Sequence, residues 1–113
     1  MIFDHRTYVC RPFTLAKQMA LYEAEGFAVQ SKHLGRPLLY AAGETGDPNA
    51  YVHVWVFRSA DDRAQKRAAM MADPAWQAYI AKSEAAGFLI SQNSVLLKPA
   101  PFFDQSGLAA HLS

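Results

Sequence analysis

The sequence predicts an α+β fold of the βαββαβ plait type, with both helices on one face of a four-stranded antiparallel sheet. Residues 51–57 alternate between large aromatic or histidine side chains and valines, which is the period of a strand. Three further segments, 2–9, 37–44 and 88–98, are rich in strand-forming residues and flank segments with helical spacing. Hydrophobic residues make up 51% and charged residues 19% of the 113 residues, which is typical of one globular domain.

The first predicted strand, Ile2–Val9, has two alternating sets of side chains and ends before Pro12. A helix is expected to begin at Pro12 or Thr14, because proline fits a first helical turn and threonine caps one. Gly26 is expected to end this helix.

In the middle of the chain, the residue pattern predicts a connector followed by a hairpin. Residues 27–36 are interpreted as the connector, either irregular or with a short extended piece at 29–31. The strand 37–44 follows it. Turn-forming residues at 45–49 join that strand to the strand 51–58 as a β-hairpin.

In the second half of the chain, the residue pattern predicts a helix in two pieces and a final strand. Ser59 is expected to cap the first piece, and Asp73 followed by Pro74 restarts the helix. Gly87 is expected to close the second piece. The polar centre of the final strand, 88–98, indicates a bulge or a bend there.

The two faces of the strand 51–57 differ in size. The valine face suits packing against the helices, whereas the aromatic face would stay uncovered because the chain has no further element. The aromatic face carries Tyr51, His53, Trp55 and Phe57. We therefore expect a homodimer or a higher oligomer, packed sheet to sheet, with a pocket between or within the copies.

Charge and cysteine content exclude several classes of protein. The net charge of +1 provides no basic field for a nucleic acid or an anionic membrane. No apolar stretch approaches the ~20 residues that span a bilayer. A single cysteine, Cys10, cannot form an internal disulfide, and residues 1–10 lack the apolar run of a secretory signal. The expected location is the cytoplasm.

Chemically capable side chains gather on the aromatic face, because the first and third strands of this fold are neighbours. They are Asp4, Arg6, Tyr8, Tyr51, His53 and Trp55. Such a mixture in an apolar cleft is typical of a small-molecule site. His53 is the candidate general base near neutral pH, with Asp4 orienting it or Arg6 stabilising an anionic intermediate. The alternative is an Asp4–Arg6 ion pair beside a hydrogen-bonded histidine in a dimer core.

Strands and helices together provide the candidate residues for binding a substrate. Tyr8, Tyr51 and Trp55 on the strands and Arg67 on a helix are the candidate substrate-binding residues. Arg67 interrupts an apolar stripe and could pair with a carboxylate instead.

Two other sets of residues on the predicted helices are expected to have structural roles. Trp76 and Tyr79 are expected to belong to the core. The basic run that contains Arg63, Lys66 and Arg67 is interpreted as a solvated face and not as a nucleic-acid patch.

No metal site or cofactor is expected. The four histidines lack the spacing of a zinc site, and Cys10 has no cysteine partner. One alternative stays open, a haem held by a single axial histidine. The chain has no glycine-rich nucleotide motif and no serine-hydrolase motif.

Four stretches in the same order resemble the NIPSNAP family: Asp4–Tyr8, Tyr51–Phe57, Asp73–Tyr79 and Pro99–Phe102. The resemblance covers residues 1–103, and residues 104–113 are expected to form a C-terminal tail. It implies a ferredoxin-like plait that pairs through its sheets as a dimeric α/β barrel. The family's first strand more often has glutamate where this chain has Asp4, so the carboxylate reaches less far.

The resemblance leaves three functions open. The first is binding of a small organic molecule. The second is a non-catalytic dimeric scaffold or interaction module. The third is an enzyme of the cofactor-independent monooxygenase or isomerase type, which rests on analogy between folds.

Overall fold

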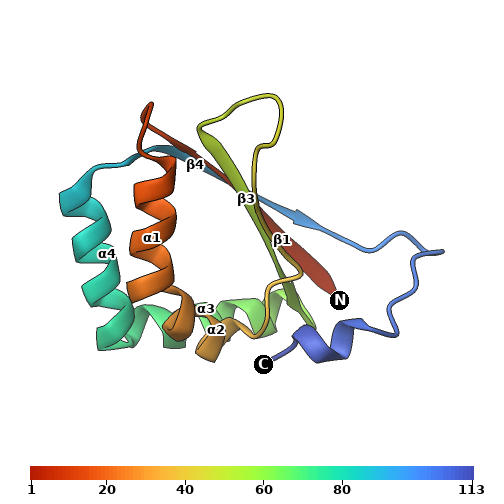
Figure 1. Cartoon of the computed structure of the whole chain (residues 1–113). Helices are drawn as coiled ribbons and strands as arrows, with labels where there is room; N and C mark the ends of the chain where they lie inside the picture. Colours follow the sequence, from red (N-terminus) through yellow and green to blue (C-terminus); the bar gives the residue numbers. More distant parts are fainter.

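The computed structural model describes residues 1–113 and shows a sheet with all four α-helices on one side (Figure 1). The elements follow in the order β1 (Ile2–Cys10), α1 (Leu15–Glu25), α2 (Phe27–Leu34), β2 (Leu39–Ala42), β3 (Ala50–Phe57), α3 (Ala60–Ala72), α4 (Pro74–Ala86), β4 (Leu89–Leu97) and the 3-10 helix η1 (Leu108–His111). The predicted α+β plait is confirmed.

The four strands pair antiparallel in the order β2-β3-β1-β4, so β1 and β3 are neighbours, as predicted, and they form the centre of the sheet. One row of directly opposite residues crosses the whole sheet: Tyr40, His53, Arg6 and Ser94. The predicted bulge lies just before 91–94: the register between β1 and β4 shifts once, where Val9 pairs with Ser91 and Cys10 with Leu89, so that Ile90 has no partner. Residues 91–94 are polar because they lie on an exposed edge strand.

The predicted helix ends are confirmed for α3 and α4. The Ser59 hydroxyl accepts a hydrogen bond from the backbone N–H of Asp62 over 3.0 Å. Asp73 ends α3 and caps α4, where its carboxylate accepts from the N–H of Ala75 over 2.9 Å. Gly87 then ends α4 in the left-handed conformation, at a φ of 64°. Local capping chemistry therefore sets these boundaries.

The connector at 27–36 was predicted wrongly, because most of it is the helix α2. Val29, Gln30 and Leu34 of α2 are buried, and Leu34 packs on the sheet residues Trp55 and Phe57. Gly26 ends α1, as predicted, and the chain turns there over the ring of Tyr22. A Cβ atom at Gly26 would approach that ring to 2.8 Å, so the close passage needs glycine.

The prediction of which sheet face meets the helices is also wrong. Leu34 of α2 and Met70 of α3 pack on Trp55 and Phe57, so the aromatic face lies under the helices. Large aromatic side chains fill the wide layer between sheet and helices. The expectation that this face needs a second copy to cover it therefore fails, and so does a pocket formed between two such faces.

The valine face lies on the other side of the sheet. The chain after β4 runs along this side, away from α1 and α4 (Figure 1). Its helix η1 contacts β3 and buries Leu108, and Phe103 meets Phe3 edge-on at 6.2 Å. The predicted tail thus packs partly on the domain. None of the helices has the length and apolar content needed to cross a membrane.

Candidate functional site

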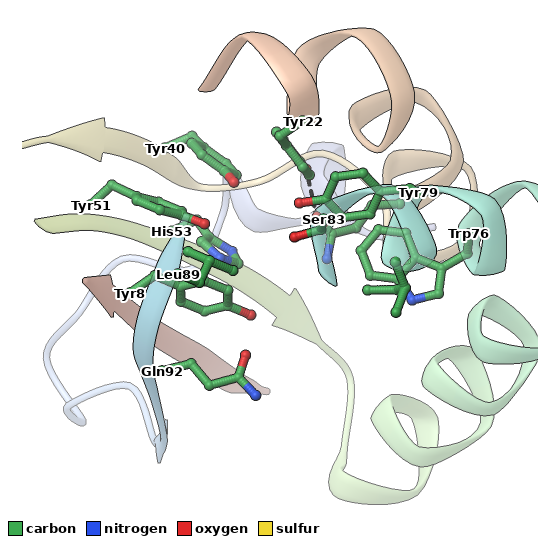
Figure 2. Close-up of a pocket in the computed structure, with 12 residues that line it drawn as sticks. Tyr8, Tyr22, Tyr40, Tyr51, His53, Trp76, Tyr79, Ser83, Leu89 and Gln92 are labelled. Atoms are coloured by element: carbon green, nitrogen blue, oxygen red, sulfur yellow. Dashed lines mark hydrogen bonds between the residues drawn. The ribbon is translucent and has the colours of Figure 1, made fainter. Parts of the chain in front are cut away.

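A cavity of about 70 Å³ lies between the aromatic face of the sheet and the helices. We call it the tyrosine cavity, because all five tyrosines of the chain line it: Tyr8, Tyr22, Tyr40, Tyr51 and Tyr79. Their hydroxyl groups point into the space between the strands and the helices (Figure 2). Three come from strands and two from α1 and α4, so the tertiary fold alone brings them together.

Aromatic rings form a stack at one wall of the cavity. β2 places Tyr40 opposite His53, and the two rings lie 4.7 Å apart and nearly parallel. Tyr22 of α1 stacks on the other side of Tyr40 at 4.9 Å. The ring of Tyr8 lies 5.0 Å from His53. This packing fixes the imidazole in one orientation beside the cavity.

Two glutamine side chains form hydrogen bonds with the tyrosine hydroxyls. The Gln18 amide nitrogen donates to the hydroxyls of Tyr79 at 3.0 Å and Tyr51 at 3.4 Å. The Tyr22 hydroxyl donates to the Gln30 carbonyl oxygen over 2.5 Å. Both glutamines are buried, and neither was predicted. The available signal was a polar residue four positions before Tyr22 on the apolar stripe of α1.

The neighbour of His53 determines its tautomer. The indole N–H of Trp55 lies 2.6 Å from His53 Nδ1. Because an indole nitrogen only donates, Nδ1 must be the acceptor, and the neutral ring carries its proton on Nε2. Burial, and then the charge of Arg6, lower the pKa of His53 to about 3. His53 is therefore a neutral hydrogen-bond donor, and the predicted role as a general base near neutral pH is not supported.

The phenols around the cavity are also neutral donors. Burial raises the pKa of Tyr22, Tyr40, Tyr51 and Tyr79. All four also lie close to other phenols, whose negative charge would oppose ionisation. None of the four is a tyrosinate near neutral pH.

A charged cluster adjoins the cavity between β1 and α3. The almost fully buried carboxylate of Asp4 accepts from Ser94 Oγ at 2.7 Å, Arg63 Nε at 2.9 Å and Arg6 Nη1 at 3.3 Å. Burial alone would raise the pKa of Asp4, but these hydrogen bonds and positive charges lower it below its usual range. The alternative of an Asp4–Arg6 ion pair is thus confirmed.

Arg63 was wrongly placed on a solvated face. It lies on the side of α3 that faces the sheet, one turn before Arg67 and two turns before the buried Met70. Arg63 forms the pair with Asp4 that had been an option for Arg67. We call Arg6, Arg63 and Arg67 the arginine cluster.

Arg67 has a different environment from its two neighbours. It is half-buried and forms no hydrogen bond or ion pair. Burial first, and then the charges of Arg6 and Arg63, lower its pKa. Arg6 links the cluster to the cavity, since its Nε donates to the Tyr8 hydroxyl over 3.1 Å.

The predicted site residues thus divide into two groups. Tyr8, Tyr51 and His53 line the cavity. Trp55 is completely buried and does not line it. Trp76 and Tyr79, which were expected to be core residues, form part of its wall (Figure 2).

Sequence comparison identifies relatives over most of the chain. The profile of the NIPSNAP family matches residues 3–104. A NipSnap homolog from Dictyostelium discoideum is 32% identical over 84 residues. The match includes 74% of this chain and 37% of that protein, so the chain spans about a third of its relative's length.

Comparison with solved structures identifies the same family of relatives. A NIPSNAP family protein with unknown function from Agrobacterium tumefaciens is 35% identical, with a TM-score of 0.84 over 91% of each chain. An uncharacterised NIPSNAP domain protein from Burkholderia xenovorans is 28% identical, with a TM-score of 0.85 over 92% of this chain and 99% of that one. An antibiotic biosynthesis monooxygenase shares 16% identity over 89% of this chain and all of its own, at a TM-score of 0.62, which shows the fold alone.

Proposed function

This chain belongs to the NIPSNAP family, and we propose that it binds a small organic molecule in the tyrosine cavity. One observation carries the proposal: neutral hydrogen-bond donors converge on an apolar space within a single chain. Twelve residues line the cavity, and eight of them are aromatic or aliphatic: the five tyrosines, Trp76, Ile80 and Leu89; the other four are Gln30, His53, Ser83 and Gln92. Aromatic and aliphatic side chains with convergent polar groups are the usual lining of a ligand site.

The size of the cavity limits the ligand. Its volume of about 70 Å³ is well below that of a drug-sized site, roughly 300–1,000 Å³. The ligand is therefore small, with at most one ring inside the cavity.

Native mass spectrometry of the purified protein tests the proposal. We expect a co-purifying small molecule, and we expect Ser83→Phe to remove it, because Ser83 lines the cavity from α4. Ala85→Phe is the matched control, since Ala85 is exposed on the same helix. A bound molecule that survives Ser83→Phe, or no ligand-induced thermal shift across a metabolite panel, would favour the scaffold alternative.

For the partner, we propose a second copy of the chain on the valine face. Leu39, Val95 and Leu97 lie on this face and are 47%, 44% and 45% exposed. Sheet pairing places Leu39, Val54, His5 and Val95 in one continuous row. An apolar surface of this kind is typical of an interface between subunits. The homodimer thus keeps one tyrosine cavity inside each subunit.

For the location, we propose the cytoplasm. The lone Cys10 is buried as a free thiol and has no partner for a disulfide. Free thiols and the absence of disulfides are usual in reducing compartments. Fractionation of cells that produce the protein tests this placement.

A further inference from the structure

We propose that the ligand of the tyrosine cavity carries a carboxylate, and that Arg67, with Arg6, binds this group beyond Tyr8, outside the cavity. The inference rests on the proposed function and adds the chemical class of the ligand. Three independent features of the structure support it: the charge balance, the donors left without partners, and the position of the arginine cluster.

The charged side chains beside the cavity have a net positive charge. Three guanidinium groups surround a single carboxylate, that of Asp4. Arg6 and Arg63 are paired with it, and Ser94 fills a further acceptor position. His53 adds no charge, because it is neutral. The cluster therefore has an excess of two positive charges in a partly buried place, and an anionic group would stabilise it.

Three polar groups at or near the cavity are donors without an acceptor, whereas the buried side-chain oxygen of Gln18 is an acceptor without a donor. Nε2 of His53 carries a proton and has no partner. The Tyr8 hydroxyl accepts from Arg6, so its own proton is free to be donated. The guanidinium of Arg67 has all five N–H groups without a protein acceptor. A ligand that matches three such groups is rich in acceptor oxygens, and a carboxylate provides two in a geometry that guanidinium binds well.

No arginine lines the cavity, but Arg6 joins the arginine cluster to it through the hydrogen bond to Tyr8. Arg6 stands opposite His53 in the sheet, in the row that also contains Tyr40. Arg67 follows Arg63 by one turn of α3, on the side of the helix that faces the sheet, and the charge of Arg6 contributes to the lowering of its pKa. A molecule whose ring occupies the tyrosine cavity can thus place a carboxylate past Tyr8 toward Arg67. Since Arg63 already holds Asp4, Arg67 is the arginine left for the ligand.

Matched acids and amides test this inference, with chemical shifts of the Trp76 indole N–H as the local reporter, because Trp76 lines the cavity. The probes are benzoate with benzamide and isobutyrate with isobutyramide, which differ in charge and hardly in shape. We expect each acid to bind at least about tenfold more tightly than its amide, and we expect added salt to reduce the difference. Arg67→Ala should bring the acid and its amide to similar affinity, whereas Arg67→Lys should keep part of the preference.

Lys17→Ala is the control for net charge, since Lys17 is exposed on α1 and has no ion pair. It should leave the preference for acids unchanged. Equal binding of acids and amides, or an acid preference that survives Arg67→Ala, would overturn the inference while binding in the cavity stands. If none of the four probes shifts Trp76, both the inference and the proposed function fail.

Discussion

The indole N–H of Trp55 donates a hydrogen bond to Nδ1 of His53 over 2.6 Å, between two side chains on the same face of β3. Side chains two apart on a strand point the same way, so this contact is local in sequence. Its effect depends on tertiary structure, because burial under the helices makes the imidazole neutral. The pair converts the histidine from a candidate base into a fixed donor that faces the cavity.

The first prediction concerns this hydrogen bond. In the wild type, long-range nitrogen NMR of the imidazole should show Nε2 protonated and Nδ1 unprotonated at neutral pH. Trp55→Phe removes the donor but keeps an aromatic ring, so both tautomers of His53 should become populated. A wild-type spectrum with the proton on Nδ1 would contradict the assignment.

The second prediction concerns stability and pH. The folded-state pKa of His53 is about 3, below its ordinary value of 6.5, so the unfolded chain binds the proton first as pH falls. The free energy of unfolding should therefore decrease as pH falls from about 6.5 toward 3, by up to about 1.4 kcal/mol per pH unit.

His53→Gln is the variant that isolates this effect, because glutamine does not titrate. Urea unfolding between about pH 7 and pH 5 avoids protonation of Asp4, whose pKa is below 3.8 and whose stabilisation is lost only at lower pH. The other three histidines are common to both proteins. Parallel pH dependences in the wild type and the variant would show that His53 titrates normally.

The third prediction concerns Asp4. Asp4→Ala leaves the arginine cluster without its carboxylate and should cost about 3–5 kcal/mol of unfolding free energy. Ser94→Ala removes one hydrogen bond to Asp4 and should cost less, about 1–2 kcal/mol. Asp61→Ala, on the exposed side of α3, is the control and should change little. Chemical denaturation measures all three. A cost for Asp4→Ala no larger than that for Asp61→Ala would contradict the buried ion pairs.

The fourth prediction concerns alkaline titration. Burial raises the pKa of Tyr22, Tyr40, Tyr51 and Tyr79, so these four phenols should not ionise near pH 10 while the protein is folded. Their tyrosinate absorbance should appear together with the loss of far-ultraviolet circular dichroism. In concentrated guanidinium chloride they should titrate near the ordinary value of about 10. Ionisation of all five tyrosines near that value in the folded protein would show an open cavity.

The fifth prediction concerns the valine face. Val95→Glu should convert the proposed dimer into a monomer, since Val95 lies on that face and is 44% exposed. Leu96→Glu is a close control, because Leu96 is 48% exposed and points to the opposite face. Sedimentation or light scattering measures the mass of each variant. A monomeric wild type at micromolar concentration would exclude the dimer.

The sequence predicted most of the elements, because their signals are local. Alternation over 51–57 predicted β3, and the Ser59, Asp73 and Gly87 caps predicted the ends of α3 and α4. Helix α2 was missed because it has only 8 residues, which is too short for its buried residues to show a helical period.

By itself, the sequence determined the βαββαβ order and the sharing of one sheet face by Arg6 and His53. Both follow from alternation along strands and from the pairing of the first and third strands in this fold. Only the tertiary structure decided which face the helices cover, because period-two alternation separates two faces without saying which one is buried. It also brought five distant tyrosines around one cavity and placed Arg63 on Asp4, since these contacts join residues far apart in the chain.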